Sequence, residues 1–198
     1  MKIKKTLLAS GIFLALLLAF YLVHIKYFRI NVVFYSAMLD GVLASVFAAV
    51  VLFKVKSFSL FNVFEKTQMI AIWFLLGYVF AISVPTVIDR SLSFYILEKL
   101  DQRGGGIQLA SFEDVFTKEY VKEHRLVDVR LTEQQESGTI IIQDGCVKLT
   151  ERGKRLADFS RYFRKNFLPK QRLLMGEYTD SLTDPFRSSE KVADYQCN

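Results

Sequence analysis

The sequence predicts a membrane α-helical protein, with three transmembrane helices followed by a small soluble α+β domain. Residues 32–53 contain a single Asp, Glu, Lys or Arg, namely Asp40, whereas such residues recur every few positions from Asp89 onward. This shift marks the passage from lipid to water. We therefore expect a transmembrane region at 1–90, a soluble domain at 91–168 and a polar, flexible tail at 169–198.

Three apolar segments, at 6–25, 32–53 and 69–88, define the transmembrane region. Each has about 20 residues, the length that a helix needs to cross ~30 Å of hydrocarbon. Backbone groups find no water there, so each segment must be helical. The basic start of the chain is typical of a cleavable leader. Because the apolar run after it is long and lacks small residues at cleavage spacing, we expect an uncleaved anchor.

The charges beside these segments indicate an orientation. With the N-terminus inside, six lysines lie on the inner side (Lys2, Lys4, Lys5, Lys54, Lys56, Lys66). Five basic residues lie on the outer side (Lys26, Arg29, Arg90, Lys99, Arg103). An excess of basic residues favours the cytoplasmic side. We expect a multi-pass protein of the cell inner membrane, with a slight preference for an external C-terminal domain.

The second apolar segment has small residues at every fourth position, namely Ala37, Gly41, Ser45 and Ala49. Such spacing makes a smooth face that another helix can approach closely. Two interpretations stay open. The face packs against the other two segments of this chain, or it is a docking face for another membrane protein.

Asp40 is the one carboxylate within the three segments. Isolated in lipid, a charged carboxylate costs about 3 kcal/mol or more, so it should face protein or water. Candidate partners are His24, Lys26 and Tyr78. The carboxylate either fixes the register of the helices through a hydrogen bond or has a role in proton or substrate handling.

The soluble half begins with a helical pattern from Ser91, which the glycines at 104–106 end. Ser111 and Asp114 form a capping-box pattern, which predicts a short helix to about residue 120. A further helix is expected from about Arg125 to Ser137, and Gly138 is expected to end it.

A hairpin and a last helix follow. Residues 139–142 are rich in β-branched side chains, and Asp144 with Gly145 is a strong tight-turn signal before a second strand at 146–149. Thr150 is expected to cap a helix that runs to about residue 167, before Pro169.

This order of elements, three helices, a hairpin and a helix, resembles a winged-helix domain over 91–167. The stretch 147–157, VKLTERGKRLA, is similar to the end of the wing and the next helix in small bacterial winged-helix regulators. The resemblance implies that the third helix would enter a DNA groove. That helix carries Arg125 and Arg130 against three acids (Asp128, Glu133, Glu136), so we do not expect nucleic acid to be a partner.

The last helix combines charge with hydrophobicity. Nine basic and two acidic residues lie between positions 148 and 172. The predicted basic surface consists of Arg152, Lys154, Arg155, Arg161, Arg164 and Lys165. The same helix has an apolar set, Leu156, Phe159, Phe163 and Phe167, which either packs into the domain core or contacts an anionic lipid surface.

Candidates for chemistry are few. The sequence has two histidines, His24 and His124, without metal-ligand spacing, and we expect no catalytic residues, no metal and no cofactor. Two cysteines, Cys146 and Cys197, are expected to be unpaired, unless the domain lies in an oxidising compartment.

Three functional hypotheses follow. The first is a non-catalytic adaptor or accessory subunit of a larger membrane assembly, such as a bacterial envelope or polysaccharide-export machine, with other membrane proteins bound through the transmembrane helices. The second is a membrane-tethered winged-helix transcription regulator. The third is a small transporter or enzyme that uses Asp40.

Overall fold

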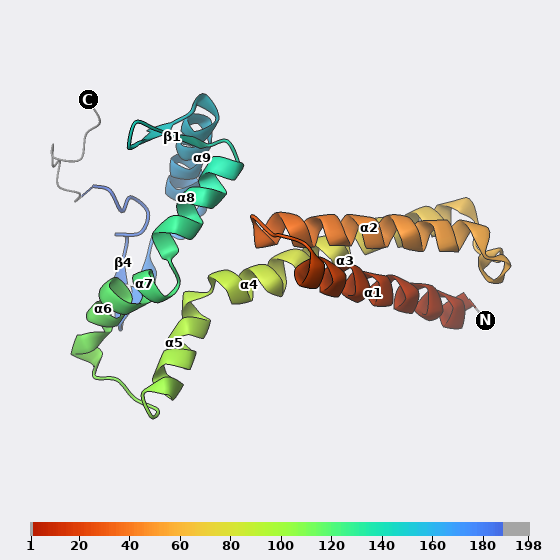
Figure 1. Ribbon diagram of the computed structural model, residues 1–198, viewed down its shortest axis with the longest axis horizontal. Helices are drawn as coiled ribbons and strands as arrows, with labels where there is room; N and C mark the ends of the chain where they lie inside the picture. The colour runs from red at the N-terminus through yellow and green to blue at the C-terminus, as the bar shows by residue number, and fades with distance from the viewer. Residues whose placement is uncertain (1, 188–198) are drawn as a thin grey trace. The chain divides into compact units, whose positions relative to one another are not determined.

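A computed structural model of the protein describes residues 2–187. Its first part is a bundle of three helices, α1 (Lys2–Tyr27), α2 (Val33–Lys54) and α3 (Val63–Ser83). The three run side by side, with α2 antiparallel to the other two (Figure 1). Each is long and apolar enough to span a membrane. The transmembrane character expected from the sequence is therefore confirmed at this level.

The bundle places small residues inside and large apolar residues outside. Gly41 of α2 meets Gly77 of α3 so closely that a Cβ on either would lie 3.0 Å from the other's Cα. Phe13 and Trp73 stack in the core with ring centroids 5.7 Å apart. The outward faces are lined by exposed large residues, among them Leu14, Leu18, Leu22, Val46, Phe47, Val50, Leu75 and Val79. This distribution suits lipid, where helices associate by close packing and their large apolar side chains meet acyl chains.

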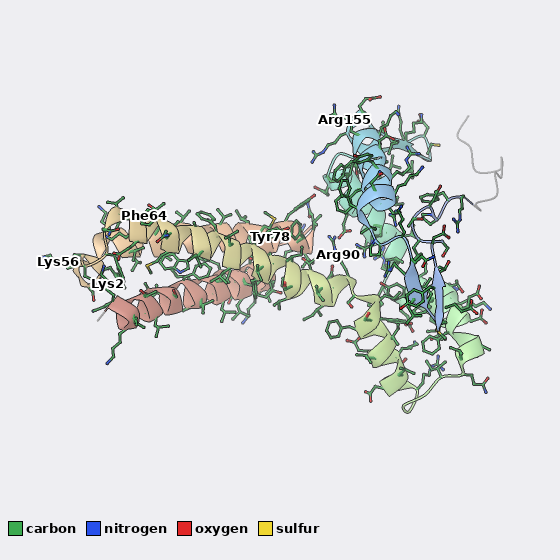
Figure 2. The ribbon with its side chains drawn as sticks, turned by 180° about the vertical axis from the view of Figure 1, so that it is seen from behind. Lys2, Lys56, Phe64, Tyr78, Arg90 and Arg155 are labelled. Atoms are coloured by element: carbon green, nitrogen blue, oxygen red, sulfur yellow. The ribbon has the colours of Figure 1, made fainter. Side chains whose placement is uncertain are left out.

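The ends of α3 follow from local sequence. Asn62 and Glu65 form a reciprocal capping box that begins the helix. Lys2 pairs with Glu65 at 2.5 Å, which joins the starts of α1 and α3, and Figure 2 shows Lys2 and Lys56 at the same end of the bundle. Pro85 ends α3, as predicted, and begins the short helix α4 (Pro85–Arg90).

The next segment contains α5 (Leu92–Gln102), the 3₁₀ turn η2 (Leu109–Ser111), α6 (Phe112–Asp114), the π-helical turn η3 (Val115–Tyr120) and α7 (Val121–Glu123). The expected capping box at Ser111 is wrong. The 3₁₀ turn already gives Ser111 helical backbone angles, φ −91° and ψ −6°, and its side chain makes no capping bond. An N-cap needs an extended backbone, so the segment begins at the 3₁₀ turn instead.

The chain divides into two compact units, one up to Arg125 and one from Leu126 onward. The second contains α8 (Leu126–Glu136), the antiparallel hairpin of β1 (Ile140–Gln143) and β2 (Cys146–Leu149), and α9 (Glu151–Phe167). Asp144 and Gly145 have the positive φ angles of the predicted turn, 53° and 74°. Thr150 caps α9 by accepting a hydrogen bond from the Gly153 N–H at 3.0 Å.

A second hairpin follows, formed by β3 (Arg172–Leu174) and β4 (Glu177–Thr179) around Met175 and Gly176. Sequence reasoning missed it inside the segment expected to be a flexible tail. The protein is thus mostly helical with small two-stranded sheets. The helices expected to build one winged-helix domain fall into different units, since α5 to α7 precede Arg125 and α8 follows it. The winged-helix assignment stays a prediction.

Candidate functional site

Asp40 is buried in the bundle, with 2% of its surface exposed. Nδ1 of His24 on α1 lies 2.9 Å from its Oδ1. Of the three candidate partners, His24 is therefore the one within hydrogen-bond distance. The second oxygen, Oδ2, is also buried, and no donor among residues 2–187 reaches it. A buried acceptor without a donor costs roughly 1–3 kcal/mol, so this oxygen is an unused binding group.

This carboxylate borders a half-open groove of about 360 Å³ between α1 and α2. His24 and five apolar side chains make the rest of its wall (Phe20, Val23, Phe28, Leu39, Leu43). Asp40 is seven residues from the start of α2, so it lies about 10 Å along the helix from that end. The site therefore combines a mostly apolar wall with two polar side chains, Asp40 and His24, within the bundle of long apolar helices.

The small-residue face of α2 is occupied within the chain over most of its length. Ala37, Gly41 and Ser45 are buried, and Ala49 is half-buried. Gly41 contacts Gly77 of α3, and the Ser45 hydroxyl donates to the Gly41 carbonyl at 2.8 Å. This arrangement corresponds to the first of the two interpretations, packing within the chain. The groove that Asp40 borders lies on another part of α2 and is lined by Leu39 and Leu43.

The predicted basic surface lies on α9. Arg152, Lys154, Arg155, Arg161 and Lys165 are exposed and Arg164 is half-buried. Figure 2 shows Arg155 on this helix. Lys154 and Arg161 both pair with Asp158. The hydrogen bond from Arg161, and after it the charge of Lys154, holds the pKa of the Asp158 carboxyl below its usual range. The other four bases form no ion pair with any residue among 2–187.

The apolar set on α9 does not pack into a core. Leu156, Phe159, Phe163 and Phe167 are exposed by 55%, 60%, 42% and 62%. The expectation that this face is buried inside the domain is therefore wrong. The hairpin covers a different side of the helix, at Gly153, where a Cβ would lie 2.0 Å from the Thr139 carbonyl oxygen. Contact with the hairpin at Gly153 thus leaves the four large side chains uncovered.

Sequence reasoning missed a polar cluster around Lys99 of α5. The buried Lys99 ammonium lies 2.7 Å from carboxylate oxygens of both Glu119 and Glu123. Tyr95 donates its hydroxyl proton to Glu123 at 2.9 Å, and Arg103 donates to Glu119. The hydrogen bonds from Lys99 lower the pKa of both glutamates and raise the pKa of Lys99. The spacing of Tyr95, Lys99 and Arg103 on one helix face was the available signal.

Cys146 is disulfide-bonded, so the expectation of an unpaired thiol is wrong at that position. The other cysteine of the chain, Cys197, lies outside the described residues. Among residues 2–187 no three His, Cys, Asp or Glu side chains gather in a way that could hold a metal ion.

Comparison with known proteins adds no relative: no protein-family model, no curated protein and no solved structure matches this chain.

Proposed function

We propose that this protein is a non-catalytic accessory subunit that docks to a larger membrane protein through its transmembrane helices. The observation that carries the proposal is the buried, unpaired Oδ2 of Asp40 at the edge of an apolar groove. A partner helix that brings a hydrogen-bond donor to this oxygen would satisfy it, while its apolar side chains fill the groove. Such interhelical bonds in membranes contribute about 1 kcal/mol.

We propose that the protein lies in the inner membrane, with its C-terminal part on the external side. The disulfide at Cys146 supports this orientation, because disulfides persist in oxidising compartments and are rare in the cytosol. Reporter fusions at the C-terminus test it: activity of a periplasm-dependent reporter is expected, and activity of a cytoplasm-dependent reporter alone would contradict it. An assembly that builds or exports envelope polymers is the host class we propose.

Two alternatives have distinct signatures. A small transporter or enzyme would use the carboxyl group of Asp40, which lies 2.9 Å from Nδ1 of His24. A tethered winged-helix regulator would need a cytoplasmic C-terminus and DNA binding. Its recognition helix would be α8, whose Asp128, Glu133 and Glu136 oppose a single Arg130 and repel phosphates.

The docking proposal is tested by co-purification of the full tagged chain from native membranes in mild detergent. Asp40→Leu should reduce the recovered partner about fivefold, the factor that corresponds to 1 kcal/mol. Asp40→Asn should retain it, because the amide oxygen still accepts a hydrogen bond. Leu75→Ala on the outward face of α3 is the matched control and should change nothing.

Two outcomes would overturn the assignment. Unchanged recovery with a normally abundant Asp40→Leu would remove the docking role of the carboxylate. Loss of cellular function in Asp40→Asn, with abundance and partner recovery unchanged, would favour the transporter or enzyme, since only ionisation has then been removed.

A further inference from the structure

The exposed apolar side chains of α9 lie in one line along the helix. Phe159 and Phe163 are 5.9 Å apart between ring centroids, and Phe163 and Phe167 are 5.3 Å apart. With Leu156 they form what we call the aromatic ridge, which extends over about 16 Å at the rise of an α-helix. Along its flank a hollow of about 370 Å³ separates the ridge from Leu168.

The unit that carries this ridge has no interior to receive it. Within residues 126–187 no hydrophobic side chain is buried; the buried residues there are Thr139 and Gly153. The hairpin likewise exposes Ile141, Val147 and Leu149. Contiguous exposed apolar surface of this kind marks a binding surface for a protein or a membrane.

The charged residues of α9 favour a membrane over a protein as the partner of the ridge. Residues 159–176 contain five basic residues and no acid. At about 100° per residue, Arg155 and Arg164 lie on the two flanks of the ridge, and Lys154, Arg161 and Lys165 lie on the opposite side. An interfacial helix has this layout: apolar side chains enter the boundary of the acyl chains and flanking bases meet anionic headgroups.

The chain supplies the proximity as well. Three spans anchor the same polypeptide, so α9 meets a bilayer at high effective concentration and modest affinity is sufficient for contact. We propose that α9 lies on an anionic bilayer surface with its aromatic ridge toward the acyl chains.

The full chain in proteoliposomes tests this, with phosphatidylcholine alone or mixed with phosphatidylglycerol, and with lipids brominated near the headgroup end of their acyl chains as quenchers. Phe163→Trp reports the ridge, and the matched control Lys165→Trp reports the opposite side. The natural Trp73 is present in every sample, so the wild-type signal is subtracted. Equal helix content by circular dichroism confirms that the variants fold.

The expected result is strong quenching of the tryptophan at 163 in the anionic vesicles, weak quenching at 165, and loss of the difference at high salt. Replacing Arg155 and Arg164 by Gln should lower the ratio of bound to free α9 by about fivefold for each charge, from ~1 kcal/mol per basic residue.

Three results would overturn the proposal. The first is that the Phe163→Trp variant is quenched no more than the wild type, whose signal comes from Trp73. The second is equal quenching at 163 and 165, which denies the orientation. The third is a tryptophan emission at 163 that shifts with the protein-to-lipid ratio without quenching, which assigns the ridge to contact between copies of the chain.

Discussion

The three-helix bundle and the α8–hairpin–α9 unit both expose large apolar side chains, but for different reasons. In the bundle, Gly41 against Gly77 and the stack of Phe13 on Trp73 close the interior, and the outward leucines are exposed. In the second unit, Gly153 also permits close packing, yet no hydrophobic side chain is buried among its described residues, 126–187.

The comparison shows that an exposed apolar surface has to be judged together with the charged side chains beside it. The outward faces of the bundle carry almost no charge, as immersion in hydrocarbon requires. The aromatic ridge is flanked by arginines, as the boundary between lipid and water requires. An uncharged apolar face is thus typical of the hydrocarbon, and an apolar ridge flanked by bases is typical of the boundary between lipid and water, which is the position we propose for α9.

Gly41→Ile should have the largest effect and should destabilise the three-helix bundle. Its Cβ would lie 3.0 Å from the Gly77 backbone, which cannot move without separating α2 from α3, and we expect a loss of at least about 3 kcal/mol. Gly11→Ile is the matched control, because nothing lies within 4 Å of a Cβ there. Thermal unfolding in detergent measures both. Equal melting temperatures for the two variants would contradict the close helix contact.

His24→Ala should be the next largest change. It leaves the buried Asp40 carboxylate without its observed partner, at an expected cost of about 3 kcal/mol. The double variant His24→Ala with Asp40→Leu should recover most of this loss, because no buried carboxyl group without a partner is left. A double-mutant cycle of detergent melting measures the coupling. A double variant less stable than either single one would show that the pair does not act as a unit.

Gly153→Ala tests the second unit. The methyl would meet the Thr139 carbonyl, which already accepts from the Thr150 N–H at 3.1 Å and hydroxyl at 3.0 Å. We expect a loss of about 2 kcal/mol, larger than the ~1 kcal/mol gain in helix propensity. Ser160→Ala on the same helix should be neutral or slightly stabilising. The predicted pattern is faster amide exchange in 139–167 with unchanged exchange in the bundle. An equal change of exchange in both regions, or no change in 139–167, contradicts it.

The Lys99 cluster gives the smallest effect, which depends on pH. The hydrogen bonds from Lys99 lower the pKa of Glu119 and Glu123 below the ordinary 4.5. A lowered folded pKa adds stability above the unfolded value, and that stability is lost as pH falls through the folded value. Amide exchange in 92–123, corrected for the intrinsic rate, should therefore rise below about pH 4. A Lys99→Met variant should lose this dependence, and a variant that keeps it would exclude the cluster as its origin.

Much of the local structure could be predicted because it depends on short-range signals. Pro85 ends α3, Gly138 ends α8 and Asp144 with Gly145 turns the first hairpin, as expected from backbone preferences. The contact between Asp40 and His24 was expected as one of three options, because a carboxylate in lipid requires a partner.

What sequence reasoning missed depends on tertiary contacts. The π-helical turn at Val115–Tyr120 was not expected, and the 3₁₀ turn at Leu109–Ser111 gives Ser111 the helical backbone angles that exclude the expected cap. Burial of the ridge on α9 was one of two interpretations that the sequence left open, since periodicity alone tells which side of a helix is apolar and not what covers it. The cluster at Lys99 joins α5 to η3 and α7. A glycine-rich turn at 104–106 separates α5 from these two elements along the chain.

The most direct test of the account is site-specific photocrosslinking from the groove in native membranes. A benzophenone amino acid at Leu39, which lines the groove beside Asp40, should form a discrete adduct with one membrane protein, and the same group at Leu75 should not. Adding Asp40→Leu should weaken the adduct about fivefold while the chain stays abundant. An adduct that forms equally from both positions, or that is equally strong without the carboxylate, would contradict docking at this groove.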